Sequence, residues 1–212
     1  MTEIPLILKL KKHTHQEIAK AQDLIIKSLY EVFERAVLHG GTSIWRCYKG
    51  NRFSEDIDVY IPRNLDKIKT LFSLLEKRGF IIQKRKTGQN SLYSKLKIGN
   101  TIVRFEALFR EIKGEIKEYE KADGMLTIVY TLSPEDLIKE KVETYIKRLK
   151  IRDIYDIFFL LRHVKDKKLI RLWLAKLITN FKKPVDEKEL KTLIIEGITP
   201  STEDMLLYVK RI

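Results

Sequence analysis

Cysteine is almost absent from the sequence, because Cys47 is the only one among 212 residues. A single cysteine excludes an intrachain disulfide and fits a reducing compartment. The sequence also lacks any run that approaches the roughly 18 apolar residues of a membrane span. Its opening letters, MTEIPLILKLKK, bring an acidic residue early and only a short apolar run, which does not match a signal peptide. We therefore expect a cytoplasmic protein with no membrane partner.

Histidine is scarce as well, and its positions show neither metal-ligand spacing nor a partner cysteine. The four histidines are His13, His15, His39 and His163. The sequence has no arrangement typical of a Ser-His-Asp or Cys-His nucleophile. We expect these histidines to be packing or surface residues.

Acidic residues are outnumbered, since 42 Lys and Arg residues face 29 Asp and Glu residues and give a net charge of +13. Such an excess favours a polyanionic partner such as nucleic acid, with a solvated basic surface as the alternative. Apolar residues make up 44% of the chain, so a sizeable core can form at this length.

The segment over residues 39–60, HGGTSIWRCYKGNRFSEDIDVY, carries the clearest chemical pattern. Asp56 and Asp58 lie two residues apart and therefore share one face of a strand. Two adjacent carboxylates repel each other unless a cation lies between them, and Mg²⁺ prefers such ligands together with substrate phosphates. The pair predicts a metal site. An Asp-x-Asp that only caps a turn or solvates a strand edge is the alternative.

Gly40, Gly41 and Thr42 precede this pair and predict a phosphate-binding turn. Glycine lets backbone N–H groups approach a phosphate closely, and threonine adds a hydroxyl. Arg52 and Ser54 are further candidate phosphate contacts, since arginine binds phosphate through two N–H groups. An ordinary helix end is the alternative for the glycines. The whole segment indicates metal-dependent nucleotidyl transfer.

Helical spacing of apolar residues predicts a helix over residues 15–38 that stops at Gly40 and Gly41. Thr42 is expected to cap a short helix through Arg46. A further helix is predicted over residues 65–77. The expected strands cover residues 56–61, 80–84, 92–98 and 101–108, and a hairpin turn at Gly99 and Asn100 joins the last two.

The second half of the chain shows a different pattern. Residues 111–124 are highly charged and predict a solvated loop. Ser133 and Pro134 then predict the start of a helix, and the pattern remains nearly all helical afterwards. We expect a mixed half followed by a helical half, divided near residue 130.

Two segments of the chain are similar to the motifs of a known family. GGTSIWRCYKGNRFSEDIDVY resembles the first motif of the AbiEii/AbiGii-type toxin nucleotidyltransferases, within the polymerase-beta-like nucleotidyltransferase superfamily. SPEDLIKEKVETYIKRLKIRDIYDIFFLL, residues 133–161, resembles the family's glutamate-lysine helix and the Arg-Asp-x-Tyr-Asp helix that follows it. The resemblance covers roughly residues 20–165 and leaves the C-terminal tail unassigned.

The resemblance implies an α+β fold, in which a small mixed-sheet nucleotidyltransferase domain precedes a helical C-terminal domain. We expect the catalytic domain over residues 1–130 and a helical domain that completes the active site over residues 131–212. The cofactor implied is Mg²⁺ or Mn²⁺, with a nucleoside triphosphate as substrate.

Two further residues follow from the family's helical motifs. Lys141 matches the lysine of the glutamate-lysine helix and is expected to neutralise the transferring phosphoryl group; a surface lysine is the alternative. Asp153 matches the functional acid of the second helix, with a structural salt bridge to Arg148 or Arg152 as the alternative.

Glu106 is the expected third metal ligand, because related enzymes place an acid on a neighbouring strand. An ion pair with Arg104 is the alternative. The predicted catalytic residues are thus Asp56, Asp58, Lys141 and Asp153, and the predicted metal ligands are Asp56, Asp58 and Glu106.

The function expected from these observations is transfer of a nucleoside monophosphate to RNA. Members of the resembled family are toxins of toxin–antitoxin pairs, and some extend the 3′ end of tRNA, which implies tRNA and an antitoxin protein as partners. Transfer to a protein or a small molecule is one alternative. A basic RNA-binding module with the same fold and no catalysis is the other.

Overall fold

The computed structural model describes residues 4–212, which build one seven-stranded mixed sheet with helices on both faces. The strand order is β3-β4-β5-β2-β1-β7-β6. The strands are β1 (Val37–His39), β2 (Ile57–Ile61), β3 (Ile81–Thr87), β4 (Ser91–Ile98), β5 (Thr101–Phe109), β6 (Glu115–Glu120) and β7 (Leu126–Thr131). The predicted α+β class is confirmed.

The helices divide between the two halves of the chain. The first half contains α1 (Leu6–Lys9), α2 (His13–Val32), α3 (Gly40–Cys47) and α4 (Leu65–Lys77). The second half contains α5 (Pro134–Arg148), α6 (Ile151–Leu160), α7 (Arg171–Thr179), α8 (Leu190–Leu193) and α9 (Thr202–Lys210), with short 3₁₀ turns η1 (Lys167–Leu169) and η2 (Glu187–Glu189). None of the helices within residues 4–212 combines the length and the apolar character of a membrane span.

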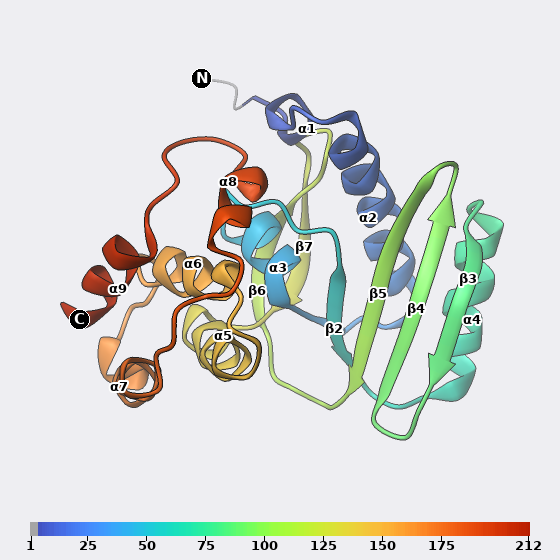
Figure 1. Cartoon of the computed structure of the whole chain (residues 1–212). Coiled ribbons are helices and arrows are strands. Elements are labelled where there is room, and N and C mark those ends of the chain that lie inside the picture. The colour runs from blue at the N-terminus through green and yellow to red at the C-terminus, as the bar shows by residue number, and fades with distance from the viewer. Residues whose placement is uncertain (1–3) are drawn as a thin grey trace.

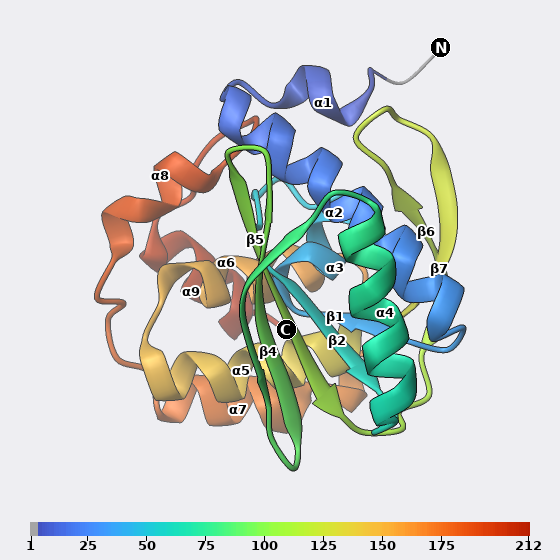
Figure 2. The same cartoon turned by 90° about the vertical axis from the view of Figure 1, so that its right-hand side faces the viewer.

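The sheet separates two hydrophobic cores. Helices α2 and α4 cover one face, and α3, α5 and α6 lie against the other, so that the later helices gather on one side of the sheet (Figures 1 and 2). Alternation along β2 produces this division, because Val59 belongs to the first core and Tyr60 to the second. The same alternation places Asp58 on the face that looks toward the C-terminal helices.

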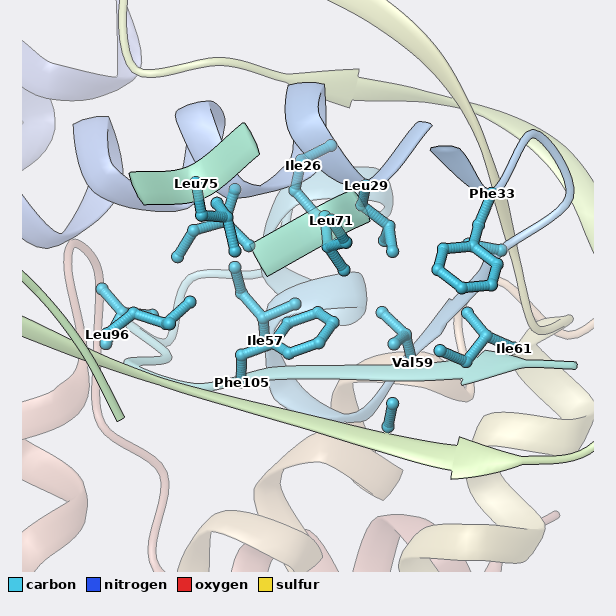
Figure 3. Packing of buried hydrophobic residues seen from close by; sticks show 14 of the residues in the cluster. Ile26, Leu29, Phe33, Ile57, Val59, Ile61, Leu71, Leu75, Leu96 and Phe105 are labelled. Atoms are coloured by element: carbon cyan, nitrogen blue, oxygen red, sulfur yellow. The ribbon is translucent and has the colours of Figure 1, made fainter. Parts of the chain in front are cut away.

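The first core is the larger apolar contact of the sheet. Figure 3 shows Ile26 and Leu29 of α2 and Leu71 of α4 above Val59 and other apolar side chains of the strands. Leu29 and Val59 are fully buried. This packing fixes the pleat of β2 and thereby directs every second side chain of that strand away from the core.

The helix predicted over residues 15–38 extends too far toward the C-terminus. Helix α2 ends at Val32, and residues from Val37 form strand β1. Val37 pairs with Tyr60 of β2 and Tyr130 of β7. The position of β1 in the sheet is therefore determined by strands that are distant in sequence. Ala36 fits the helical spacing although it lies after the end of α2, because it is buried in the first core from the segment that leads into β1. No glycine or proline marks the end of the helix.

The predicted roles of the glycines and threonine in this region are also corrected. Gly40 does not end a helix; it begins α3 with a φ of +69°, and Thr42 lies inside that helix. His39 occupies the N-cap position and makes no side-chain cap hydrogen bond. The short predicted helix itself is present.

The solvated loop predicted over residues 111–124 is wrong for its central part. Glu115–Glu120 forms the edge strand β6, paired antiparallel with β7, a strand absent from the prediction. Charged residues are typical of an edge strand because they discourage pairing with another chain, and here they hid the strand pattern. Tyr119, with no exposed surface, is the residue of β6 that packs into the first core.

The remaining predicted elements are confirmed within a few residues. Helix α4 spans Leu65–Lys77, and a hairpin joins β4 to β5 through Gly99 and Asn100. Ser133 caps α5 by accepting a hydrogen bond from the Asp136 backbone N–H at 3.1 Å. The second core draws on both halves of the chain, while the division into two domains near residue 130 stays a prediction.

Replacing Leu29 by alanine should lower the free energy of unfolding by about 2–5 kcal/mol, because it leaves a cavity between α2 and the sheet. Leu24→Ala is the matched control, since this leucine lies on the same helix and is 36% exposed. Urea unfolding followed by circular dichroism measures both. Equal losses in the two variants would contradict the assigned core.

Candidate active site

The three predicted metal-binding carboxylates lie on neighbouring strands of the sheet. Asp58 in β2 is directly opposite Glu106 in the parallel strand β5. Asp56 comes just before β2 begins, two residues from Asp58 and on the same side. All three point away from the first core, because the residues between them, Ile57 and Phe105, are buried in it.

A small polar cavity of about 160 Å³ opens over these carboxylates and is called the phosphate cavity below. Every residue that lines it is polar or glycine. The lining residues are Gly41, Arg52, Ser54, Asp56, Asp58, Arg104, Glu106, Lys141, Arg148 and Arg152. Five of them are cationic and three are acidic, so the cavity combines carboxylates with a surplus of positive charge. That combination suits a metal ion together with phosphate groups.

The two glycines are required by the closeness of the side chains around them. A Cβ atom on Gly41 would lie 2.6 Å from Arg52 Nη2 and from Ser54 Oγ. A Cβ atom on Gly40 would collide with the Asp58 carboxylate, and the φ of +69° also favours glycine there. The glycine pair therefore keeps the backbone at the start of α3 in direct contact with the site.

Asp56 is held by Arg104 from the adjacent strand. Arg104 Nε donates to Asp56 Oδ1 at 2.6 Å, and its Nη2 donates to Oδ2, which makes a bidentate pair. The alternative of an Arg104–Glu106 pair is thus not what the structure contains. Within residues 4–212, no three His, Cys, Asp or Glu side chains converge in an arrangement that holds an ion, and this pairing of Asp56 is consistent with that result.

Asp58 and Glu106 lack such compensation. Among the residues that the structure describes, neither carboxylate takes part in a salt bridge or a side-chain hydrogen bond. Burial raises the pKa of Asp58 most, and the charge of Asp56 raises it further. Burial likewise raises the pKa of Glu106, with additional contributions from Asp58 and Asp56. The charges of His39, Lys141 and Arg104 lower the pKa of Asp58 without forming a direct ion pair with it. Two neighbouring carboxylates without a directly paired counter-ion fit a divalent cation, and Asp56 would complete the set once released from Arg104.

Lys141 of α5 reaches the same cavity from the helical half. Its ammonium lies 2.8 Å from Asp156 Oδ2 and 3.5 Å from Asp153 Oδ1, both on α6. The lysine side chain is only 8% exposed and lines the cavity, so it is not the surface lysine of the alternative. The two aspartates fix its position beside the carboxylates of the sheet.

Two arginines share these aspartates with Lys141. Arg52 binds Asp156 through Nε and Nη2, each at 2.8 Å. Arg148 binds Asp153 through Nε at 2.8 Å and Nη2 at 2.7 Å. Burial alone would raise the pKa of Asp156, but Arg52 and Lys141 outweigh it and hold that pKa below its ordinary value. We call these five residues the charge cluster.

The structure brings most of the predicted site residues to one place. Asp56, Asp58, Glu106, Lys141, Gly41, Arg52 and Ser54 all line the phosphate cavity. Gly40 lines the cleft next to it. Thr42 does not line either space, since its hydroxyl donates to the carbonyl oxygen of Asp56. Asp153 is fully buried, and it forms ion pairs with Lys141 and Arg148 instead of lining the cavity itself.

Several residues of the site were not assigned a role from the sequence. Arg104, Arg148, Arg152 and Asp156 belong to the cavity or the charge cluster, and His39 stacks on Tyr60 with its Nδ1 3.1 Å from Glu140 Oε2. The spacing of Arg104 and Glu106 on one strand face was the available signal for Arg104. The others depend on how α5 and α6 pack on the sheet, for which one sequence offers no pattern.

Fold and site together define a nucleotidyltransferase, since a glycine turn, paired acids on a mixed sheet and a buried lysine converge on one polar cavity. The chain belongs to the AbiEii family. A family model described as the nucleotidyl transferase AbiEii toxin of a type IV toxin–antitoxin system matches residues 25–205. No curated protein matches the sequence.

Solved structures show the same fold at low sequence identity. MenT4, a nucleotidyltransferase toxin from Mycobacterium tuberculosis H37Rv, is 18% identical with a TM-score of 0.65, over 93% of this chain and 82% of its own. JHP933 from Helicobacter pylori is 21% identical with a TM-score of 0.64, over 93% and 89%. The antibiotic-resistance factor ANT(2″)-Ia is 14% identical with a TM-score of 0.51, over 76% and 91%.

Asp58→Asn should raise the stability of the metal-free protein at neutral pH while it abolishes activity. The substitution removes a buried charge whose pKa is raised in the folded state, so the charged form opposes folding. The stabilisation is largest above that raised pKa and shrinks as the pH falls through it, because the wild-type carboxyl then becomes neutral too. Thermal unfolding in EDTA between about pH 4 and pH 8 tests this. A variant less stable than wild type at every pH would contradict it.

Proposed function

We propose that this protein is a metal-dependent nucleotidyltransferase that moves a nucleoside monophosphate from a nucleoside triphosphate to the 3′ end of an RNA, with tRNA as the acceptor. The observation that carries the proposal is the phosphate cavity, where Asp58 and Glu106 lie in register on adjacent strands without a direct ion pair, and where Lys141 lines the same space. We further propose a cytoplasmic location and regulation by an antitoxin protein, as the family description suggests.

The triphosphate binds first through the start of α3 and the cations of the cavity. The backbone at Gly41 and the hydroxyl of Ser54 contact phosphate oxygens, and Arg52 supplies a fixed positive charge. Arg52 is held by Asp156, so little conformational freedom is lost when it meets the substrate. Asp56, Asp58 and Glu106 would hold Mg²⁺ or Mn²⁺, which when bound supplies neutralisation of phosphate charge and orientation of the reacting groups.

The transfer itself is an in-line displacement at the α-phosphorus. A hydroxyl oxygen of the acceptor forms the new bond to the α-phosphorus, and its proton passes to a carboxylate of the phosphate cavity. The bond from the α-phosphorus to the bridging oxygen breaks, and pyrophosphate leaves with that oxygen. Lys141 is placed to stabilise the negative charge that develops, because Asp156 and Asp153 hold its ammonium in position. Asp153 acts through Lys141 and Arg148 and is therefore a positioning residue.

RNA is favoured as the acceptor by charge. The net charge of +13 and the cations of α5 and α6 around the cavity attract a polyanion. An aminoglycoside or other small cationic acceptor would be repelled by the same surface. Transfer to a protein remains the alternative acceptor, and the experiment below distinguishes it.

Lys141→Met should reduce transfer of label from α-labelled triphosphates to total tRNA by about 10²–10³-fold, because one fixed charge at the reacting phosphate is lost. Lys86→Met is the matched control, as this lysine is exposed on the edge strand β3. Labelled RNA with wild type and control, but not with Lys141→Met, supports the proposal. If the label appears on protein and not on RNA, the acceptor is a protein and the assignment of RNA is wrong. Absence of any transfer or pyrophosphate release by folded wild type contradicts the proposal.

Arg104→Ala should increase the affinity for Mn²⁺, because the ion would no longer compete with the guanidinium for Asp56. Isothermal titration calorimetry without nucleotide measures this, and an increase of about tenfold corresponds to 1.4 kcal/mol. Arg85→Ala is a control on β3, outside the cavity lining. Unchanged or weaker Mn²⁺ binding in Arg104→Ala would contradict the metal assignment of Asp56.

A further inference from the structure

A second space adjoins the phosphate cavity and shares part of its wall. This cleft, of about 540 Å³, has Asp58, Lys141 and Arg148 in common with the phosphate cavity. It extends from there along α5 to Trp173 on α7 and is called the Trp173 cleft below. A group in this cleft borders Asp58 and Lys141, whereas Arg52 and Ser54 line only the phosphate cavity.

The two spaces differ in chemistry. The phosphate cavity has no apolar lining residue, whereas Tyr60, Leu108 and Trp173 contribute to the Trp173 cleft. Trp173 is half-buried, and Lys176 lies over its ring with Nζ 5.2 Å from the centroid. Trp45, the other tryptophan of the sequence, is 2% exposed and lines neither space. The cleft therefore contains one partly exposed indole, on which a base can stack if it takes the place of the Lys176 ammonium.

Two cations of the Trp173 cleft have no acidic partner in the part of the chain that the structure describes, whereas Lys139, Lys141 and Arg148 are paired with aspartates outside its lining. Arg110 and Lys147 make no salt bridge among residues 4–212. Glu140 is engaged by His39 and by the Tyr60 hydroxyl, and Glu143 is paired with Lys176. Positive charge thus remains along the cleft between Trp173 and Lys141, where a phosphodiester backbone could be bound.

We propose that the Trp173 cleft receives the single-stranded 3′ end of the RNA acceptor. A base near that end stacks on Trp173, the backbone phosphates contact Lys147 and Arg110, and the terminal hydroxyl meets the triphosphate beside Asp58 and Lys141. Aromatic stacking beside a positively charged groove is the usual way in which proteins hold single strands. This assignment rests on the proposed function, in that it takes RNA to be the acceptor.

Binding can be measured without catalysis. A short single-stranded RNA with a free 3′-hydroxyl is titrated into the full-length protein in EDTA, without nucleotide, while tryptophan fluorescence and the anisotropy of a 5′ label are recorded. RNA is expected to quench Trp173, and Trp173→Phe identifies the signal because Trp45 remains. Trp173→Ala should weaken binding about tenfold, whereas Trp173→Phe should retain most of the affinity.

The charge contribution has its own readout. Lys147→Ala should reduce the slope of log affinity against log salt concentration by about 0.7, the value for one phosphate contact on a single strand. Lys86→Ala removes the same charge from β3 and should leave the slope unchanged. In the transfer assay, the Trp173 and Lys147 variants should raise KM for RNA and leave KM for the triphosphate near the wild-type value.

The outcomes separate this inference from the proposed function. Quenching by RNA that depends on Trp173 and Lys147 supports the cleft even where label is transferred to another acceptor. Transfer to RNA that is indifferent to both variants overturns the cleft and keeps the function. Quenching of Trp173 by the triphosphate alone, with no competition from RNA, also overturns it, because the cleft would then hold the substrate nucleoside.

Discussion

The buried ion pair between Arg52 and Asp156 is the contact on which the rest of the site depends. It joins the loop after α3 to helix α6, two segments that the chain separates by 104 positions. Arg52 is 5% exposed and Asp156 is 1% exposed, so neither charge is solvated by water. Removing Asp156 should cost about 3–5 kcal/mol, because the charge of Arg52 is then left buried without an acidic partner. The helical half is thereby locked to the glycine turn and the sheet.

From this contact the geometry of the site follows in order. Asp156 also binds Lys141, and Asp153 beside it binds Arg148, so two aspartates orient three cations toward the sheet. The sheet contributes the opposing charge through Asp58 and Glu106, which are in register on β2 and β5. Burial is the main cause of their raised pKa values and the neighbouring carboxylates add to it, so the charged forms are disfavoured in the apo protein. These carboxylates lower the free energy of unfolding of the apo protein, and binding of a cation and phosphates would restore it. Groups with perturbed pKa values are common at functional sites.

Much of this site could be predicted from the sequence, because its parts are local patterns. The glycine pair, the Asp-x-Asp spacing and the family's glutamate-lysine helix each lie within a few consecutive residues, and the structure places most of them around one cavity. Strand β1 and strand β6 could not be predicted in the same way. Val37 takes its place only because Tyr60 and Tyr130 flank it, and the alternating charges of β6 obscure a strand anchored by Tyr119.

The charge cluster failed to appear in the sequence for a related reason. Asp153 and Asp156 are three residues apart, which predicts a shared helix face, and the salt bridge between Asp153 and Arg148 was the structural alternative for that acid. The bonds of Asp156 to Arg52 and Lys141 could not be predicted from this spacing. Arg52 lies in a loop where an arginine reads equally well as a direct phosphate contact. In the structure it has both properties, since it binds Asp156 and still lines the phosphate cavity. Only the packing of α6 against the loop reveals that the arginine is fixed before a substrate arrives.

The distribution of charge between the two halves of the chain has a consequence for how the enzyme works. The carboxylates of the site come from β2, β5 and the residue before β2, while Lys141, Arg148 and Arg152 come from α5 and α6. Neither half alone contains both the carboxylates proposed to bind metal and Lys141. Both cavities border the same three residues, Asp58, Lys141 and Arg148, so the triphosphate and the acceptor would meet where the halves join. A fragment limited to the sheet would retain the acids together with Arg52 and Arg104, but it would lack Lys141, Arg148 and Arg152.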